Sequence, residues 1–451
     1  MVVTSPTRPF TAAGPGTAAT VWAPHLAEAP REPADLAGVR RVVVVGAHPD
    51  DESLGAGGVI ATARADDLRV DLVCATDGEG SHPGSPTHTP GDLADRRAAE
   101  WVEAARALGV DPSRTHRLRL PDGGVGTHVS ELTTLLVDLV GDGRDAVIVA
   151  PWREDGHCDH EAVGRAASAA ARRTGAQLWE FPIWFWHWAG PGDVRARWLR
   201  PFALDTEPAE RKQRAIDAHT SQVSALSTLE GDETLLTPDL LAHFAGGNEW
   251  FVITTAEECV DDALDRLHRD EPDPWGVDSR WYEQRKRALL LAALPRERFR
   301  HALEIGCSTG ALTAALAERA DRVLGVDRSV AALTAARRRL AATSNAEVAD
   351  LDVPQAWPDE GPFDLVVVSE VGYFLSPRAL DALVDRISTG LTRDGVVALC
   401  HWRHPVEGWV SDADDVHRRF LEGSLPTLQA EYRDRDVEIR VHSEHWPDPT
   451  G

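Results

Sequence analysis

Cysteine is scarce in this chain, and no long hydrophobic run occurs in it. The 451 residues include five cysteines, an odd number, and these stand in apolar strand-like runs or inside motifs rather than in a disulfide framework. We therefore expect a reducing compartment, the cytoplasm. No stretch of about 18 apolar residues is present, and no basic segment followed by an apolar one opens the chain, so neither a membrane span nor a secretory signal is predicted.

Positive charge is also in short supply. Lys and Arg total 47 against 72 Asp and Glu, which leaves a net charge of -25, and Lys212 and Lys286 are the sole lysines. Such a chain repels phosphate backbones and anionic lipid headgroups, so neither nucleic acid nor a membrane is an expected partner. At about 150 residues per domain, the length predicts two or three folded units and excludes a single small domain.

Buried strands alternate with amphipathic helices along most of the chain. Residues 40–47 (RRVVVVGA) form a continuous β-branched run, which is typical of a strand covered on both faces of a parallel sheet. Helices are expected over residues 55–65, 93–108 and 208–226, with Asp92 opening the second of them. The alternation predicts an α/β fold with two doubly wound, Rossmann-like domains in tandem.

Composition changes suggest the domain boundaries. Residues 1–38 are rich in Pro, Ala, Thr and Gly and are predicted to form an irregular leader. A second change comes in an acidic segment that contains EPDPWG (271–276), whose prolines and glycine resist regular structure. We therefore expect the first domain at 39–254, a linker at 255–279 and the second domain at 280–451.

Two clusters of His and Asp follow strand ends that are far apart in the sequence. HPDDE (48–52) comes directly after the first strand, and GHCDH (156–160) follows a later one. A hydrolytic zinc ion takes about three N or O ligands and keeps an open position for water. We predict His48, Asp51 and His160 as these ligands. The structural alternative is that the Asp residues cap the next helix and that HCDH is a surface loop.

The pair of motifs AHPDDE and HxDH resembles the PIG-L/LmbE family of zinc-dependent N-deacetylases over about residues 40–253. This resemblance implies a deacetylase fold in which His48, Asp51 and His160 hold the metal and Asp50 is the general base. It also implies that His157 polarises the amide oxygen and then helps the amine to leave. Amide hydrolysis needs these parts: a nucleophilic water, an acceptor for its proton and positive charge at the oxyanion.

Further residues of the first domain are candidates for supporting roles. Asp159 is expected to orient His157 through a hydrogen bond. The family resemblance suggests that Arg96 or Arg97 faces the pocket, although an arginine on a helix is as often a solvated charge. The aromatic residues of the segment 179–188 (WEFPIWFWHW), namely Trp184, Trp186 and Trp188, form either a stacking platform for a sugar or part of the core. His219 and Gln222 resemble the AHxSQ helix of the same family.

A glycine turn in the second half suggests a nucleoside site. ALEIGCSTG (302–310) is a strand running into a turn and a helix, and Asp327 ends the next strand 21 positions after Gly306. Because Ser308 takes the place of the second glycine of G-x-G-x-x-G, a dinucleotide is the minor interpretation.

The form E-x-G-C-x-x-G, followed by Asp327 and ADL (349–351), resembles class I S-adenosylmethionine-dependent methyltransferases. DPWG, WYE (281–283) and the following Arg-Lys are similar to the NodS-like subgroup, known for N-methylating de-N-acetylated amino sugars, and the resemblance covers about residues 272–404. It implies that S-adenosyl-L-methionine is the cofactor, with Asp327 on the ribose hydroxyls and Asp350 and Leu351 at the adenine edge. The full predicted set is Glu304, Gly306, Gly310, Asp327, Asp350, Leu351, Glu370, Trp275 and Arg285.

Some assignments in the second half stay open. Glu370, His401, Arg403 and His404 are candidates for binding or deprotonating the methyl acceptor, or are structural residues. Trp275 covers the cofactor or packs the linker. The tail 417–451 is a lid, an extra strand pair or poorly ordered.

Taken together, the motifs predict a bifunctional enzyme with a small-molecule substrate, an N-acetylated amino sugar or glycoconjugate. An amide nitrogen is a poor nucleophile, so deacetylation would come first and N-methylation of the freed amine second. Three alternatives remain: O-methylation, a thiol-conjugate amide as substrate, or one catalytic half joined to a binding or scaffold module.

Overall fold

The computed structural model describes residues 16–28, 32–271 and 273–446, and it divides the chain into two compact units, Met1–Val260 and Asp261–Gly451. Each unit is built around one mixed seven-stranded sheet. Among the described residues, no helix is both long and apolar enough to cross a bilayer.

The first sheet has the strand order β3-β2-β1-β4-β5-β7-β6. Its strands are β1 (Arg41–Gly46), β2 (Arg69–Thr76), β3 (Thr115–Leu120), β4 (Ala146–Pro151), β5 (Gln177–Phe181), β6 (Leu199–Ala203) and β7 (Asn248–Thr254). β1 pairs in parallel with both β2 and β4, whereas β7 runs antiparallel to β5 and β6. β1 is buried on both faces, as its run of valines predicts.

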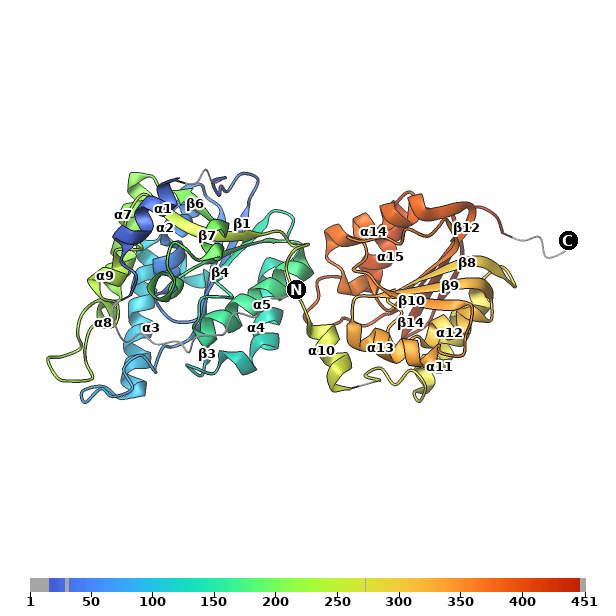
Figure 1. The fold of residues 1–451 in the computed structure, drawn as a ribbon, viewed down its shortest axis with the longest axis horizontal. Helices are drawn as coiled ribbons and strands as arrows, with labels where there is room; N and C mark the ends of the chain where they lie inside the picture. Colours follow the sequence, from blue (N-terminus) through green and yellow to red (C-terminus); the bar gives the residue numbers. More distant parts are fainter. Residues whose placement is uncertain (1–15, 29–31, 272, 447–451) are drawn as a thin grey trace. The chain divides into compact units, whose positions relative to one another are not determined.

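Helices cover both faces of this sheet, with α4 and α5 on one side and α2, α3 and α7 on the other (Figure 1). The helices are α1 (Ala19–Glu28), α2 (Asp51–Ala65), α3 (Pro90–Ala107), α4 (Val129–Val140), α5 (Cys158–Thr174), α6 (Phe185–Trp188), α7 (Thr206–Ala218), α8 (Thr220–Val223) and α9 (Pro238–Leu241). Val42 and Val44 of β1 share one core cluster with Leu54 of α2 and Trp101 of α3. Apolar side chains of α2 and α3 therefore cover this face of β1, and the His and Asp motifs come after the strand ends.

Part of the predicted irregular leader is helical, which corrects the prediction. Trp22 of α1 is buried, packs edge-on against Trp186 with ring centroids 5.0 Å apart, and donates its indole N–H to the Trp186 carbonyl. Burial of this one large ring anchors a helix that a Pro- and Ala-rich composition did not suggest.

Three predicted helix boundaries also differ. α2 begins at Asp51, before the predicted residue 55. α3 begins at Pro90, and its cap is Thr89, while Asp92 is the reciprocal partner in a capping box. The predicted helix 208–226 is split into α7 and α8 at His219, whose ψ of 57° is not helical and whose ring binds Ser53 of α2.

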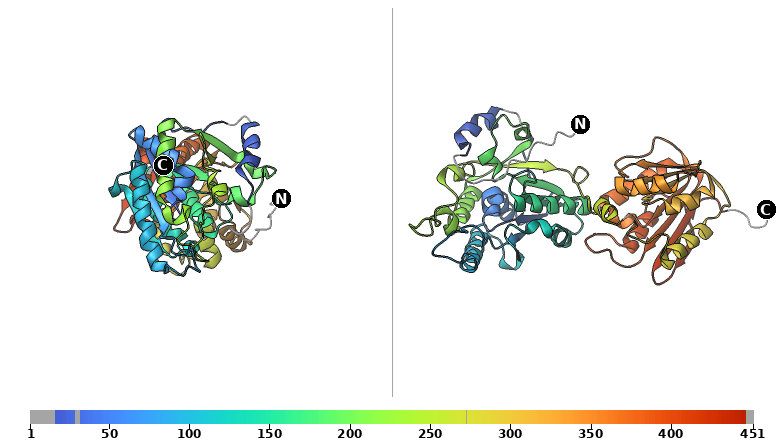
Figure 2. Two further views of the ribbon diagram at one scale, coloured as in Figure 1. Left: turned by 90° about the vertical axis from the view of Figure 1, so that its left-hand side faces the viewer. Right: turned by 60° about the horizontal axis from the view of Figure 1, so that its bottom comes forward.

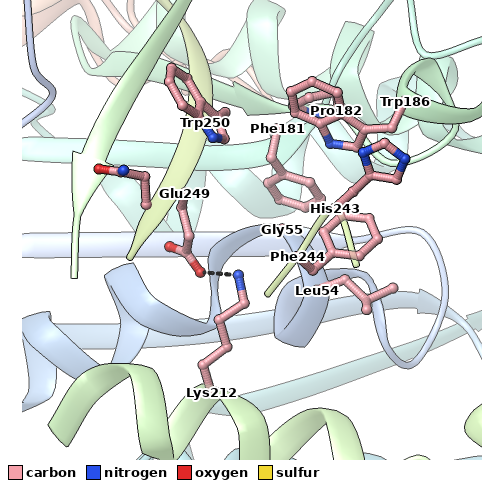
Figure 3. Close-up of a pocket in the computed structure, with 11 residues that line it drawn as sticks. Leu54, Gly55, Phe181, Pro182, Trp186, Lys212, His243, Phe244, Glu249 and Trp250 are labelled. Atoms are coloured by element: carbon pink, nitrogen blue, oxygen red, sulfur yellow. Dashed lines mark hydrogen bonds and ion pairs between the residues drawn. The ribbon is translucent and has the colours of Figure 1, made fainter. Parts of the chain in front are cut away.

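A buried ion pair fixes α2 against its neighbours (Figure 3). Lys212 of α7 donates to Glu249 of β7 at 2.8 Å, and the same carboxylate accepts the backbone N–H groups of Gly58 and Val59. A Cβ at Gly58 would lie 3.1 Å from the Glu249 carboxyl carbon, so glycine permits this close approach. With its partners satisfied, the pair holds the helix whose first turn carries Asp51.

The second sheet has the strand order β10-β9-β8-β11-β12-β14-β13. Its strands are β8 (Phe299–Ile305), β9 (Ala320–Asp327), β10 (Ala346–Asp350), β11 (Phe363–Ser369), β12 (Leu391–Trp402), β13 (Leu428–Arg433) and β14 (Val437–Ser443). β14 is antiparallel to β12 and β13. Counted along each unit, the order is the same in both sheets. The predicted class of two doubly wound α/β domains in tandem is confirmed. Of the three possibilities for the tail, the strand pair is present as β13 and β14, and residues 447–451 lie outside the described residues.

The helices of the second unit again cover both faces of its sheet (Figure 2). They are α10 (Ala263–Asp270), α11 (Trp281–Ala293), α12 (Ala311–Ala317), α13 (Val330–Arg339), α14 (Pro377–Gly390) and α15 (Ala413–Glu422). One core cluster joins the sheet to α14 and α15, and another joins it to α11 and α12. α10 lies in the predicted linker, yet Asp265 accepts from the Ser329 hydroxyl and the Ala331 N–H, so this segment packs on the second unit.

Candidate active sites

The two His/Asp motifs of the first unit meet at the carboxyl ends of β1 and β4. His48 follows β1, Asp51 opens α2, and His160 lies in the first turn of α5. His160 Nε2 is 3.3 Å from both Asp51 Oδ1 and His48 Nδ1, and His48 Nδ1 is 3.7 Å from Asp51 Oδ2. His48 and His160 therefore each direct one ring nitrogen to a common point, and Asp51 directs its carboxylate to the same point.

Asp155, which the sequence analysis did not single out, sets the orientation of His160. Its buried carboxylate lies 2.7 Å from His160 Nδ1 and accepts the N–H groups of Ile183, Trp184 and Phe185. Asp155 engages Nδ1 of His160, so Nε2 is the ring nitrogen that faces the Asp51 carboxylate. Nitrogen and oxygen donors suit zinc, so these residues fit the metal that the resemblance implies.

We expect Asp155→Asn to weaken metal binding by about 10-fold, because an amide is a poorer acceptor for His160 Nδ1–H. Zinc affinity measured by competition with a chromogenic chelator is the readout. The exposed Asp138→Asn on α4 serves as the matched control. Unchanged zinc affinity in Asp155→Asn would show that this carboxylate does not orient the ligand.

Asp50, the predicted base, is buried beside the ligands and has a φ of 147°, a conformation that non-glycine residues rarely adopt. Arg97 holds it there. The guanidinium donates to Asp50 Oδ2 at 3.1 Å, to the Pro49 carbonyl at 2.9 Å and to the Gly78 carbonyl at 2.9 Å. Burial raises the pKa of Asp50 to about 6, and the charge of Arg97 opposes this shift. Of the two candidate arginines, Arg97 is thus the one that reaches the site.

His157 lies against the ligands, with its ring centroid 5.0 Å from that of His48 and 4.7 Å from that of His160. Burial and the two neighbouring histidines lower the pKa of His157 to about 3. Its Nδ1 accepts the backbone N–H of Asp159 at 3.3 Å. His157 is therefore a neutral imidazole at the edge of the cluster.

Two carboxylates lie on the far side of His48. Asp122 Oδ1 is 3.2 Å and Asp159 Oδ2 is 3.4 Å from His48 Nε2. The Asp159 carboxylate also accepts the N–H groups of Gly123 and Val125. Burial tends to lower the pKa of His48, but Asp122 and Asp159 more than offset this and raise it to about 9. Asp122 was not among the predicted site residues; the signal for it is its place directly after the end of β3, in the segment LPDG (120–123).

The other supporting candidates are distributed differently from the prediction. Arg96 forms an ion pair with Glu100 at 3.1 Å, whereas it is Arg97 that contacts Asp50. Trp184 and Trp186 are 9% and 3% exposed and belong to the core, which was the structural alternative for them. Gln222 is buried, with its amide donating to Ser221.

The glycine turn of the second unit joins β8 to α12. Gly306 and Gly310 both have φ of 77°, which glycine adopts without strain. Asp327, at the end of β9, accepts the backbone N–H of Ser308 at 2.9 Å and that of Ser329 at 2.8 Å. The predicted nucleoside residues therefore surround one turn, with an acidic side chain fixed beside it.

Glu304 is buried below this turn and accepts the Thr313 hydroxyl at 2.5 Å. Burial raises its pKa to about 8. The folded state therefore holds a proton that the unfolded chain has released above about pH 4.5, so the stability of the second unit is expected to fall as pH rises from about 5 to about 8.

We expect Glu304→Gln to remove this fall, with the difference between variant and wild type growing by at least about 1 kcal/mol over that range. Urea unfolding of the full-length chain is the measurement, and the transition of the second unit is the one that S-adenosylhomocysteine shifts to higher urea. Parallel pH profiles for the two proteins would contradict the buried-proton assignment.

The remaining predicted cofactor residues lie around the turn or apart from it. Asp350 is in register with Asp327 and exposed, and the Leu351 N–H donates to the Asp327 carbonyl at 3.1 Å. Trp275 packs edge-on against His268, whose Nε2 is 3.3 Å from the Ser308 hydroxyl. Arg285 instead donates to Tyr432 and to Asp434, both at 2.6 Å, on the β13–β14 hairpin.

The fold and these two sites define a chain that joins a deacetylase domain to a methyltransferase domain. Residues 43–171 match the family model of GlcNAc-PI de-N-acetylase (PIG-L), and residues 256–409 match that of nodulation protein S (NodS). The N-terminal part is a PIG-L deacetylase domain, and the C-terminal part is a NodS-like S-adenosylmethionine-dependent methyltransferase domain.

Individual relatives likewise match either the deacetylase part or the methyltransferase part of the chain. The chain is 29% identical over 269 residues to a 1D-myo-inositol 2-acetamido-2-deoxy-alpha-D-glucopyranoside deacetylase of Mycobacterium sp. (strain KMS), over 48% of this chain and 85% of that protein. It is 36% identical over 108 residues to nodulation protein S of Rhizobium tropici, over 24% of this chain and 45% of that protein, and so spans less than half of that relative. The solved N-methyltransferase NodS from Bradyrhizobium japonicum WM9 in complex with S-adenosyl-L-homocysteine is 26% identical, over 41% of this chain and 98% of that one, with a TM-score of 0.37.

Proposed function

We propose that the first domain is a zinc-dependent hydrolase of the N-acetyl group of an amino sugar or sugar conjugate, and that the second N-methylates the freed amine. The observation that carries the proposal is the convergence of His48 Nδ1, His160 Nε2 and the Asp51 carboxylate within 3.7 Å, beside a buried Asp50. The deacetylase relative in Mycobacterium, named for an acetamido sugar conjugate, supports the substrate class.

In the proposed hydrolysis, Asp50 accepts the proton of the attacking water, and Arg97 keeps its carboxylate in place. Zinc held by His48, Asp51 and His160 would supply the positive charge that makes water acidic and polarises the amide. His157, as a neutral imidazole, would donate a hydrogen bond from Nε2 to the oxyanion and so help the amine to leave, while the backbone N–H of Asp159 orients its ring through Nδ1. The proton that Asp50 takes from water would go to the leaving amine.

In the proposed transfer, Asp327 binds the ribose hydroxyls of S-adenosyl-L-methionine, and the turn from Gly306 to Gly310 lets the backbone approach the cofactor. Glu304, Asp350, Leu351 and Trp275 are proposed as further cofactor residues on the same resemblance, whereas Arg285 is held by the β13–β14 hairpin. The order of the two reactions follows from chemistry, because an amide lone pair is delocalised and only the free amine attacks the sulfonium methyl.

Mass spectrometry of N-acetylated amino-sugar substrates incubated with the chain, zinc and S-adenosylmethionine tests the proposal. We expect a loss of about 42 Da followed by a gain of about 14 Da, and no gain when zinc is withheld. A gain of about 14 Da on a substrate that keeps its acetyl group would show methylation of oxygen and contradict the order.

A further inference from the structure

An exposed thiol lies at the edge of the first site and has no part in the proposed hydrolysis. Of the five cysteines, all of which belong to the described residues, Cys158 alone is exposed and the other four are buried. Cys158 is the first residue of α5, between His157 and Asp159. Thiolate sulfur, imidazole nitrogen and carboxylate oxygen are the ligands that zinc takes in proteins, and sulfur favours thiophilic cations over hard ones.

One ligand atom from each of these three residues can reach a common point. A ring nitrogen of His157, Cys158 Sγ and a carboxylate oxygen of Asp159 all lie within 4.8 Å of one another. Cys158 Sγ is 3.9 Å from Asp159 Oδ1. With bonds of about 2.3 Å to sulfur and about 2.1 Å to oxygen, a tetrahedral zinc ion holds two such ligands about 3.6 Å apart. The thiol and the carboxylate are therefore spaced for one cation with little movement.

The two oxygens of Asp159 make different contacts. Oδ2 accepts the Gly123 N–H at 2.7 Å and lies 3.4 Å from His48 Nε2, so it faces the first site. Oδ1, which faces the thiol, accepts the Val125 N–H at 3.2 Å. A carboxylate oxygen has two lone pairs, so Oδ1 can hold this N–H and a cation together.

This group differs from the predicted zinc ligands in both chemistry and access. His48, Asp51 and His160 offer nitrogen and oxygen but no sulfur, and Asp51 and His160 are buried. Cys158 instead faces solvent. A cation from solution therefore meets the thiol directly, and a sulfur–metal bond distinguishes this group from the first site.

We propose that His157, Cys158 and Asp159 form a second cation site, selective for thiophilic divalent ions such as zinc and cadmium, and that its occupation inhibits the hydrolase. The thiol releases its proton to water as the sulfur–metal bond forms, and the imidazole and the carboxylate each contribute a lone pair. The inhibition rests on the proposed function, whereas the binding of the cation does not.

Inhibition follows because the two sites share residues. In the proposed hydrolysis, His157 donates a hydrogen bond to the oxyanion while the backbone N–H of Asp159 orients its ring. A cation bound to the ring holds the imidazole beside Cys158 and Asp159, where it no longer serves the substrate. Two dications repel each other, so the second site fills at a higher zinc concentration than the first. Hydrolysis is therefore expected to rise with the first equivalent of zinc and to fall with an excess.

Cadmium titration of the full-length chain, loaded with one equivalent of zinc, tests the site without a substrate. Because the first site has no sulfur ligand and the other cysteines are buried, a thiolate-to-cadmium charge-transfer band in the ultraviolet reports Cys158. We expect the band to saturate at one cadmium per chain while the zinc stays bound, and to be absent from Cys158→Ser. Cys259→Ser, which removes a buried thiol, is the matched control and should keep the whole band.

Acetate release measures the inhibition, with each protein compared with its own rate at one equivalent of zinc. Excess zinc is expected to lower the wild-type rate by at least about 10-fold, and Cys158→Ser should need about 100-fold more zinc for the same inhibition because the sulfur ligand is lost. Magnesium, which prefers oxygen ligands, should not inhibit either protein.

Alkylation of the wild type decides if Cys158→Ser does not fold: cadmium should slow the reaction of Cys158 with iodoacetamide by at least about 10-fold. An unslowed reaction, the same charge-transfer band in Cys158→Ser, loss of the bound zinc as cadmium binds, or equal inhibition by zinc in the two proteins would overturn the second site. The proposed function fails differently: no N-acetylated substrate releases acetate, although the band forms.

Discussion

Asp50→Ala is expected to keep zinc and to lose hydrolysis of the N-acetyl group by about 1,000-fold. The three predicted ligands do not include Asp50, and each keeps its own support, such as Asp155 on His160. The variant removes the carboxylate that Arg97 holds beside them, and with it the proposed proton acceptor for the attacking water. Zinc content by atomic absorption and acetate release are measured on the same sample.

The comparison variants distinguish the loss of the general base from the loss of a metal ligand. His48→Ala should lose both zinc and hydrolysis, and the exposed Asp95→Ala on α3 should lose neither. Full hydrolytic activity in Asp50→Ala would show that another group accepts the proton, and loss of zinc would make Asp50 a ligand.

Asp327→Ala is expected to weaken S-adenosylhomocysteine binding by about 100-fold and to abolish methyl transfer at ordinary cofactor concentrations. The carboxylate holds the N–H groups of Ser308 and Ser329, so the change loosens the turn and also removes the proposed acceptor for the ribose hydroxyls. Calorimetric titration with S-adenosylhomocysteine checks it.

Hydrolysis provides the internal control for this variant. The two units are separate compact bodies, so acetate release by Asp327→Ala should match that of the wild type. Asp321→Ala, which removes an exposed partner of Arg298, is the matched control for binding. Hydrolysis lost together with cofactor binding would show that the units do not act independently.

The sequence predicts most of the fold because its signals are local. A run such as 41–46 predicts a buried strand from a few neighbouring residues. The motifs HPDDE and GHCDH likewise predict that His48 and His160 follow strand ends. The roles of Asp50, His157 and Asp159, and of the cofactor residues, stay predictions that the variants above address.

What the sequence did not reveal depends on contacts between distant segments. Asp122 is 74 positions from His48, and Trp22 is 164 positions from the carbonyl that it binds. Arg96 and Arg97 are adjacent and chemically identical, and only the packing of α3 decides which one reaches Asp50. Arg285 was assigned to the cofactor by resemblance, whereas its partners lie on a hairpin that the sequence left undefined.

The inserted position of the last strand in each sheet has a consequence for biosynthesis. β7 lies between β5 and β6, and β14 lies between β12 and β13. In both sheets, therefore, two strands that are synthesised earlier have no partner at one edge until the last strand has been synthesised. Until it leaves the ribosome, the nascent chain presents unpaired strand edges, which are sites for aggregation. The first sheet is complete once Thr254 has emerged, while translation of the second continues, so the period of exposed edges comes twice, and each period ends with the arrival of a single strand.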